Sequence, residues 1–181
     1  MELLDVVDEE GAPTGEKCTR AVAHETGVRH RTVHIWVIRR EGGRVQVLLQ
    51  RRASNKDSFP GQYATSVAGH VQAGDLPLES ARRELWEELG ILAVPEKLRF
   101  AGSFPVHCER EFYGKPFRDN EIAFVYVYAQ PVDIGSMKLQ KEEVDTVDWF
   151  DLEEVCKEVD QQSQKYFIPR KGLKLLMEQV C

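Results

Sequence analysis

The sequence predicts an α/β (α+β) fold, a mixed β-sheet packed between helices. Three observations predict it: apolar, β-branched runs lie on both sides of a central helical segment, further helical segments lie near the carboxyl end, and no linker or repeat divides the 181 residues. This order of elements is typical of a sheet covered by helices. Because a chain of this length can bury one core, we expect a single domain over residues 1–181.

The first half of the chain is predicted to be mainly strand. Apolar runs predict strands over Leu3–Val7, Val33–Arg39, Val45–Gln50 and Tyr63–Val67. The turn-rich Asp8–Gly15 makes the first strand part of a hairpin, which we expect either to extend the sheet or to form a homodimer contact. Gly42-Gly43 joins the next two strands as an antiparallel pair, and Asn55–Gln62 is a predicted loop.

The central helix is predicted over Pro77–Leu89. Proline suits a first turn, and Ala81, Leu85 and Leu89 form an apolar stripe. Gly90 is a natural stop, and Asp75, just upstream, can accept from free amide groups or favour the positive end of the helix.

The second half predicts further strands and the terminal helices. Strands are expected over Leu98–Val106, Ile122–Ala129 and Thr146–Phe150, and helices over Leu152–Val159 and Pro169–Val180. Asp151 is the expected cap of the first of these helices. Gly114 and Pro116 indicate a polar loop over Phe112–Glu121.

Composition narrows the class of function. The net charge of −6 leaves no cationic excess to follow a nucleic-acid backbone or an anionic membrane. The four scattered cysteines show no Cys-x-x-Cys pair, which favours free thiols. Without a leader-like or membrane-spanning run, we expect a cytoplasmic protein.

The chemistry is concentrated in the central helix. Glu84, Glu87 and Glu88 stand at i, i+3 and i+4 and therefore share one face, with Arg83 able to pair with Glu87. Solvated surface glutamates are the ordinary interpretation. A glycine-containing loop before the helix favours instead a site for Mg²⁺ (or Mn²⁺) that also holds substrate phosphates.

This stretch resembles the Nudix box. Gly69 is followed by five residues, Asp75, seven residues and then Arg83-Glu84-Leu85-Trp86-Glu87-Glu88-Leu89-Gly90-Ile91, which keeps every fixed position of the box except that Asp75 replaces glutamate. The resemblance implies a Nudix α/β/α sandwich, with the box at residues 69–91 as a loop–helix–loop.

The resemblance also implies roles. Glu84, Glu87 and Glu88 are the expected metal ligands together with the Gly69 carbonyl, and Glu87, Glu88 and Arg83 are expected to be catalytic. Asp75 replaces the acid that locks the loop to Arg83. The catalytic base stays open among Glu87, Glu121, Glu142 and Glu143.

Segments outside the box resemble the isopentenyl-diphosphate isomerase-like branch of Nudix proteins. These include His24…His30-Arg31, Leu48–Arg52, Ser66–His70 and Asp119–Ile122. The branch implies a second metal site of His24, His30, His70, Asp119 and Glu121. The isomerase cysteine is replaced by Ala68, which cannot relay a proton, so hydrolysis is favoured over isomerisation.

We therefore predict a magnesium-dependent hydrolase of a diphosphate linkage in a nucleoside or prenyl diphosphate-type small molecule. Arg51, Arg52 and Lys56 are the candidate phosphate contacts. His34, in an apolar strand, is expected to be half-buried and hydrogen-bonded. The alternatives are isomerase-like proton transfer, a non-catalytic ligand-binding Nudix module and RNA decapping.

Overall fold

The computed structural model describes residues 2–56, 58–112 and 114–180. Its strands are β1 (Leu3–Val7), β2 (Pro13–Thr19), β3 (His30–Glu41), β4 (Arg44–Arg52), β5 (Tyr63–Ala64), β6 (Val67–His70), β7 (Leu98–Phe112), β8 (Lys115–Tyr128), β9 (Val144–Asp151) and β10 (Tyr166–Phe167). Its helices are α1 (Arg20–Thr26), α2 (Pro77–Leu89), α3 (Leu152–Asp160) and α4 (Arg170–Val180), with short 3₁₀ turns at Pro95–Lys97 and Ile134–Ser136.

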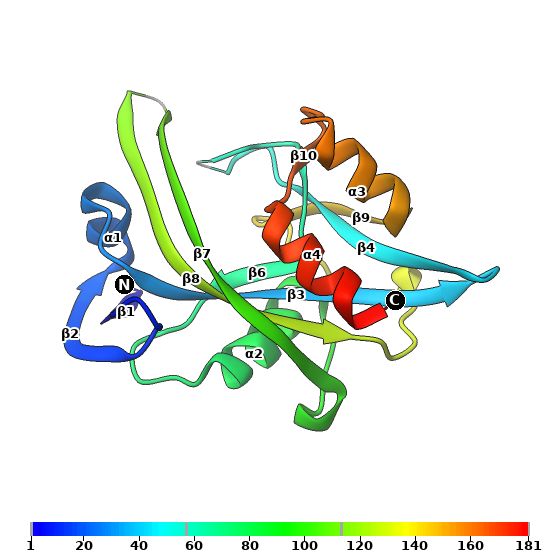
Figure 1. The fold of residues 1–181 in the computed structure, drawn as a ribbon, viewed down its shortest axis with the longest axis horizontal. Coiled ribbons are helices and arrows are strands. Elements are labelled where there is room, and N and C mark those ends of the chain that lie inside the picture. Colours follow the sequence, from blue (N-terminus) through cyan, green and yellow to red (C-terminus); the bar gives the residue numbers. More distant parts are fainter. Residues whose placement is uncertain (1, 57, 113, 181) are drawn as a thin grey trace.

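One mixed sheet organises the described chain (Figure 1). Its neighbouring strands run in the order β10, β5, β4, β3, β8, β7, while β6 pairs with β3 and β9 pairs with β4. The β3–β8 and β5–β10 pairs are parallel, and the other pairs are antiparallel. The predicted mixed α/β (α+β) sheet is thus confirmed.

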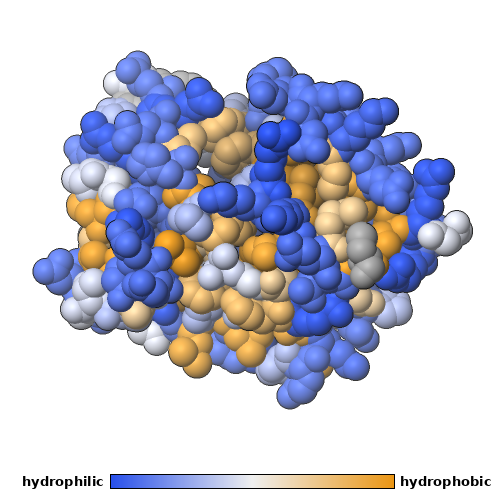
Figure 2. Space-filling view, in the orientation of Figure 1, coloured by the Kyte–Doolittle hydropathy of each residue, from blue (hydrophilic) through white to orange (hydrophobic). Residues whose placement is uncertain are grey.

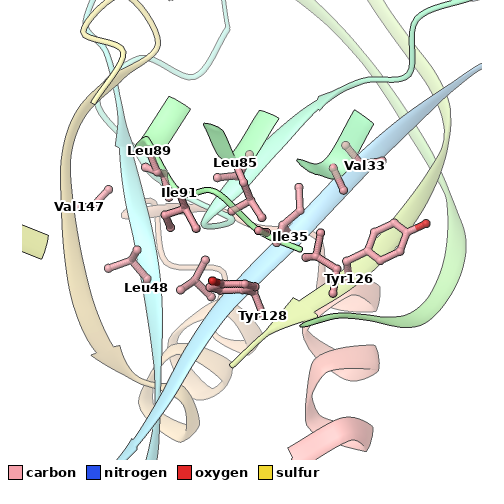
Figure 3. Packing of buried hydrophobic residues seen from close by; sticks show 14 of the residues in the cluster. Val33, Ile35, Leu48, Leu85, Leu89, Ile91, Tyr126, Tyr128 and Val147 are labelled. Carbon is pink, nitrogen blue, oxygen red and sulfur yellow. The ribbon is translucent and has the colours of Figure 1, made fainter. Parts of the chain in front are cut away.

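The sheet is covered on both faces, because side chains alternate along β3. Val33, Ile35 and Val37 pack in the cluster that includes Leu85 and Leu89 of α2. Figure 3 shows Val33 and Ile35 beside these two leucines. The other face of β3 presents residues such as Trp36 to a second cluster. That cluster contains the apolar faces of α3 and α4, including Leu152, Val155, Leu173 and Leu176. Two cores separated by the sheet give the predicted sandwich.

Helix α2 has the predicted ends. Pro77 is its first residue, and Gly90 ends it with a φ of 71°, a left-handed conformation that favours glycine. Of the two roles predicted for Asp75, hydrogen-bond capping is wrong: Leu76 occupies the cap position, and no side chain caps the helix. Asp75 contributes its backbone carbonyl instead, which accepts from the Arg31 guanidinium at 3.3 Å.

Two loop and strand predictions are also wrong. Phe112–Glu121 is not a loop over its length: Phe112 ends β7, and residues 115–121 lie in β8, in a long hairpin that extends beyond the rest of the sheet (Figure 1). Gly114 is in a turn, and residue 113 lies outside the described residues. Tyr63–Val67 is not one strand, because β5 pairs with β4 and β6 pairs with β3. Ser66 lies between them, and its hydroxyl accepts from the Val37 amide and donates to the Leu48 carbonyl.

The amino-terminal hairpin stands beside the main sheet instead of extending it. β1 and β2 form their own two-stranded sheet, joined to the segment before α2 by the Leu4–Gln72 bridge. The buried Asp5 carboxylate accepts from Arg31 at 2.9 Å and from the Gly74 amide at 2.9 Å. The hairpin therefore anchors the loop that leads into α2, and the homodimer contact stays a prediction.

Two further expectations concern free cysteine thiols and membrane-spanning segments. Cys18 and Cys108 form no disulfide there, and Cys181 lies outside the described residues. None of the helices in the described ranges is long and apolar enough to cross a bilayer.

Replacing Asp5 by alanine tests the hairpin anchor. The change leaves a buried Arg31 without its counter-charge, so the free energy of unfolding should fall by about 3 kcal/mol in denaturant titrations. Asp145→Ala is the control, because Asp145 pairs with Arg51 where both side chains are about half exposed, and its loss should stay below about 1 kcal/mol. Equal losses in the two variants would contradict the anchoring role.

Candidate functional site

A cleft of about 680 Å³ gathers most of the residues predicted to be functional. Its walls come from the amino-terminal segment, β3, β4, β6, α2, the β7–β8 hairpin and the segment before β9. The predicted residues that line it are His24, Arg52, Lys56, Gly69, His70, Arg83, Glu84, Glu87, Glu88, Asp119 and Glu121. Polar and charged residues cover most of the face of the molecule shown in Figure 2, with apolar patches between them.

The acids of α2 differ in exposure. The residues Glu84 and Glu88 are 9% and 5% exposed, whereas the Glu87 side chain is 48% exposed. Glu84 lies directly against β6: a Cβ added to Gly69 would stand 2.2 Å from the Glu84 Cδ. Only glycine at position 69 allows the carboxylate to lie this close to the strand.

Arg83 ties the strand to the helix. Its guanidinium donates to the Glu84 carboxylate at 2.7 Å, to the Glu87 carboxylate at 3.3 Å and to the His70 carbonyl at 3.0 Å. These bonds orient two acids at once and hold the end of β6. The predicted lock between Asp75 and Arg83 is absent from the described residues, and the Asp5–Arg31 pair stabilises that loop instead.

The positive charge near Glu84 and Glu88 is too small to balance their two carboxylates. Burial, with a further contribution from Glu87, raises the pKa of Glu84 to about 7 in spite of Arg83. Burial next to Glu84 and Glu143 raises the pKa of Glu88 well above its usual range, although Gln50 donates to its carboxylate at 3.1 Å. A divalent cation would supply the missing charge, so the donor set fits Mg²⁺ or Mn²⁺.

A second cluster lies on the other side of β6. The side chains of His24, His30 and His70 offer ring nitrogens within 4.8 Å of one another, and His30, Asp119 and Glu121 form an overlapping set with the same spacing. The His24 Nε2 and His70 Nε2 atoms are 3.2 Å apart, and His24 Nδ1 lies 3.0 Å from Asp119 Oδ1. The five predicted residues are therefore together.

Several ligand atoms in this cluster are buried without a hydrogen bond. They are His24 Nδ1, His30 Nε2 and Asp119 Oδ1, whose close contacts do not have hydrogen-bond geometry. Burial and the nearby His30 and Arg20 lower the pKa of His70 well below its usual range, so this imidazole is neutral. The neutral His70 imidazole and the unpartnered atoms of His24, His30 and Asp119 fit a transition-metal ion.

The two arginines that end β4 have different roles. Because successive side chains on a strand point to opposite faces, Arg52 lines the cleft with Gln50 while Arg51 does not. Arg51 donates to the Gly61 carbonyl and lies near Asp145, so it is not positioned for the predicted phosphate contact. Lys56 does reach the cleft, where it forms an ion pair with Glu143.

The cleft also contains residues that the sequence did not reveal. Lys17 and Arg20 add positive charge from the amino-terminal side, and Phe117 and Phe167 add aromatic surface. Thr19, which caps α1, and Gly27, which ends it, are the local signals that would have located the helix carrying His24.

His34 departs from its expected state. It is 8% exposed, its Nδ1 atom is buried without a hydrogen-bond partner among the described residues, and burial lowers its pKa to about 4. It therefore presents a neutral imidazole to the cleft, next to Ala68 on the paired strand. Among the three candidate bases outside the box, Glu121 and Glu143 line the cleft and Glu142 does not.

Comparison with known proteins decides the family. A model of the NUDIX domain matches residues 19–171. The chain belongs to the Nudix family. It is 36% identical over 159 residues to an uncharacterized Nudix hydrolase of Clostridium acetobutylicum, covering 88% of this chain and 74% of that protein.

Two further Nudix comparisons agree. Nudix hydrolase 3 of Arabidopsis thaliana is 36% identical over 156 residues, which are 84% of this chain but 20% of that longer protein. The crystal structure of DR0079 from Deinococcus radiodurans has a TM-score of 0.70 at 19% identity and covers 97% of this chain and 98% of that one. The family and its hydrolase relatives support the prediction of a pyrophosphohydrolase, and the structural match supports the Nudix fold.

Gly69→Ala tests the contact between strand and acid. The added methyl group would displace the Glu84 carboxylate, so Mn²⁺ binding, followed by electron paramagnetic resonance, should weaken by about tenfold or more. Gly135→Ala is the control, because the nearest atom to its added Cβ is 3.4 Å away in an exposed turn. Unchanged Mn²⁺ affinity in a folded Gly69→Ala protein would contradict this account.

Proposed function

We propose that the protein hydrolyses a diphosphate linkage in a nucleoside or prenyl diphosphate-type substrate and that it needs Mg²⁺ or Mn²⁺ to do so. One observation carries the proposal. Two carboxylates of one helix, Glu84 and Glu88, are buried side by side at a substrate-sized cleft without enough positive charge to balance them. Burying such a pair is costly unless a cation completes the site.

Glu84, Glu87, Glu88 and the Gly69 carbonyl would hold the metal. When bound, the ion neutralises phosphate charge and makes a bound water more acidic. Arg83 keeps the acids oriented through the bonds to Glu84 and Glu87. Arg52 and Lys56, which line the same cleft, would bind the phosphates, because guanidinium and ammonium groups are the usual phosphate partners.

The attacking water needs a carboxylate to accept its proton. Glu87 is the exposed acid of α2, and Glu121 is the acid that lines the cleft beside the histidines. Glu121 already accepts from the Thr32 hydroxyl at 3.0 Å and contacts His30. We retain both as catalytic residues, with Glu88 and Arg83 beside them.

We also propose that His24, His30, His70, Asp119 and Glu121 hold a second metal ion, as the resemblance to the isomerase-like branch implies. The support is the set of buried ring nitrogens and carboxylate oxygens without hydrogen bonds. Isomerisation is the less favoured activity. Ala68 stands opposite His34, at the position where the isomerase has its cysteine, and its methyl group cannot transfer a proton.

Replacing Glu88 by glutamine tests the metal centre. The change keeps the volume and removes the charge, so turnover should fall by about 100-fold or more. The assay is phosphate and monophosphate release from nucleoside and prenyl diphosphates, with Mg²⁺ and with EDTA. Glu79→Gln is the control on the same helix, because Glu79 is exposed and pairs only with Arg82 among the described residues. Comparable activity in both variants would overturn the assignment.

The second site is tested by counting bound ions. Mass spectrometry of the native protein should find one metal ion fewer per chain in His24→Gln than in the unaltered protein, because His24 contacts both His70 and Asp119. His107→Gln is the control, since the His107 side chain is 68% exposed. An identical metal content in all three proteins would exclude the second ion.

A further inference from the structure

The side chains of the histidine cluster have inner and outer atoms with different surroundings. The Nε2 atoms of His24 and His70 are 3.2 Å apart, and the His30 Nε2 atom lies 3.5 Å from the Glu121 Oε1 atom. The inner atoms therefore face one another across a small space. The outer atoms, which are Nδ1 of each imidazole and Oε2 of Glu121, contact other parts of the protein.

His30 shows what an outer partner does. Its Nδ1 atom is 2.9 Å from the Val28 carbonyl oxygen. A carbonyl oxygen only accepts, so this contact places a proton on Nδ1 and leaves Nε2 with its lone pair when the ring is neutral. An outer hydrogen bond also fixes the orientation of the ring, and histidines that bind metal ions generally have one.

Glu2 holds the corresponding place at His70. The Glu2 Oε1 atom is 3.4 Å from the His70 Nδ1 atom, and the two side chains are 30% and 15% exposed. The backbone fixes this segment on both sides. The Arg20 amide donates to the Glu2 carbonyl at 3.1 Å, and the next carbonyl, that of Leu3, accepts from the Ala73 amide at 2.8 Å. The amino-terminal segment therefore lies between the start of α1 and the loop after β6.

Thr32 holds the outer oxygen of Glu121. Its hydroxyl donates to the Glu121 Oε2 atom at 3.0 Å, and the two residues are 4% and 7% exposed. They come from neighbouring parallel strands, β3 and β8, and both line the cleft. The hydrogen bond fixes the carboxylate with its Oε1 atom toward His30.

We infer that Glu2 and Thr32 are positioning residues of the second metal site, Glu2 through His70 and Thr32 through Glu121. This inference rests on the proposed second ion. Each residue contacts the outer atom of one ligand and so turns the inner atom toward the space that the cluster shares. Outer partners of this kind preorganise a site, because the ligands lose little further freedom when an ion binds. The amino-terminal segment would then complete the site as well as anchor the loop before α2.

A purely structural role makes a different prediction. Glu2 also lies 3.8 Å from the Arg20 guanidinium, and the Thr32 hydroxyl satisfies a buried carboxylate. If these contacts only stabilised the fold, their removal would lower the free energy of unfolding and leave metal affinity unchanged.

The test titrates the metal-free protein with Co²⁺ and measures binding by calorimetry, with His24→Gln defining the signal that belongs to the histidine cluster. Thr32→Val and Glu2→Ala should each weaken this binding by about tenfold, because each removes one outer partner. Thr32→Ser and Glu2→Gln keep a hydroxyl and an oxygen acceptor, so they should retain most of the affinity. The controls are Thr65→Val, which alters a buried threonine of the same cleft outside the cluster, and Glu16→Ala, which alters an exposed acid of β2.

Proton NMR of the Co²⁺-loaded protein gives a second readout. A histidine that binds Co²⁺ through Nε2 shows its Nδ1 proton as a strongly shifted signal, which is visible when an outer partner slows exchange with water. Glu2→Ala should lose one such signal. Thr32→Val should keep all of them, because Thr32 acts on a carboxylate.

The outcomes separate the inference from the proposal on which it rests. Weakened Co²⁺ binding that Thr32→Ser and Glu2→Gln largely avoid supports the inference. Unchanged Co²⁺ affinity in Thr32→Val or in Glu2→Ala overturns it for that residue and leaves the second site in place, and so does an equal loss in the matching control. Absence of a histidine-dependent Co²⁺ signal in the unaltered protein overturns the second ion and this inference together.

Discussion

The burial of Glu84 and Glu88 at the edge of a short strand is the constraint on which the rest of the site depends. Burial and the repulsion between neighbouring carboxylates raise the pKa of both groups, so the charged forms are costly to keep there. The surroundings reduce it only in part. Gly69 makes the space, Arg83 pairs with one acid, and Gln50 donates to the other. The remaining deficit of positive charge is the reason why we propose a cation site on this helix.

The architecture around the helix serves to keep these acids in place. Ser66 lies between β5, which pairs with β4, and β6, which pairs with β3. The change of partner strand places Gly69 of β6 against Glu84 of α2. The loop before α2 is held from the other side by the buried Asp5–Arg31 pair. A separate hairpin at the amino end thus fixes the entry to α2.

The sequence predicted the features that local residue patterns determine, and it missed features that depend on contacts between distant segments. The ends of α2 followed from Pro77 and the apolar stripe within the helix and from Gly90 directly after it. The hairpin over residues 112–121 was misread because Gly114 and Pro116 indicate a loop, whereas pairing between β7 and β8 decides the conformation. Only the register of β4 reveals that Arg52, and not Arg51, faces the cleft. The histidine cluster was expected from resemblance alone, since its members come from α1, β3, β6 and β8.

The position of β6 explains how one cleft can offer ligands for cations and also positive charge for an anion. Gly69 and His70 are adjacent, so their side-chain positions face opposite sides of the strand, one toward Glu84 and the other toward His24. Both sides therefore offer ligands to cations, while Arg20, Arg52 and Lys56 line the same cleft with positive charge. In a chain with a net charge of −6, the proposed diphosphate substrate would gain a favourable environment mainly from these cations and from the proposed metal ion. Metal binding and substrate binding should accordingly depend on each other, which a cleft lined by basic residues alone would not require.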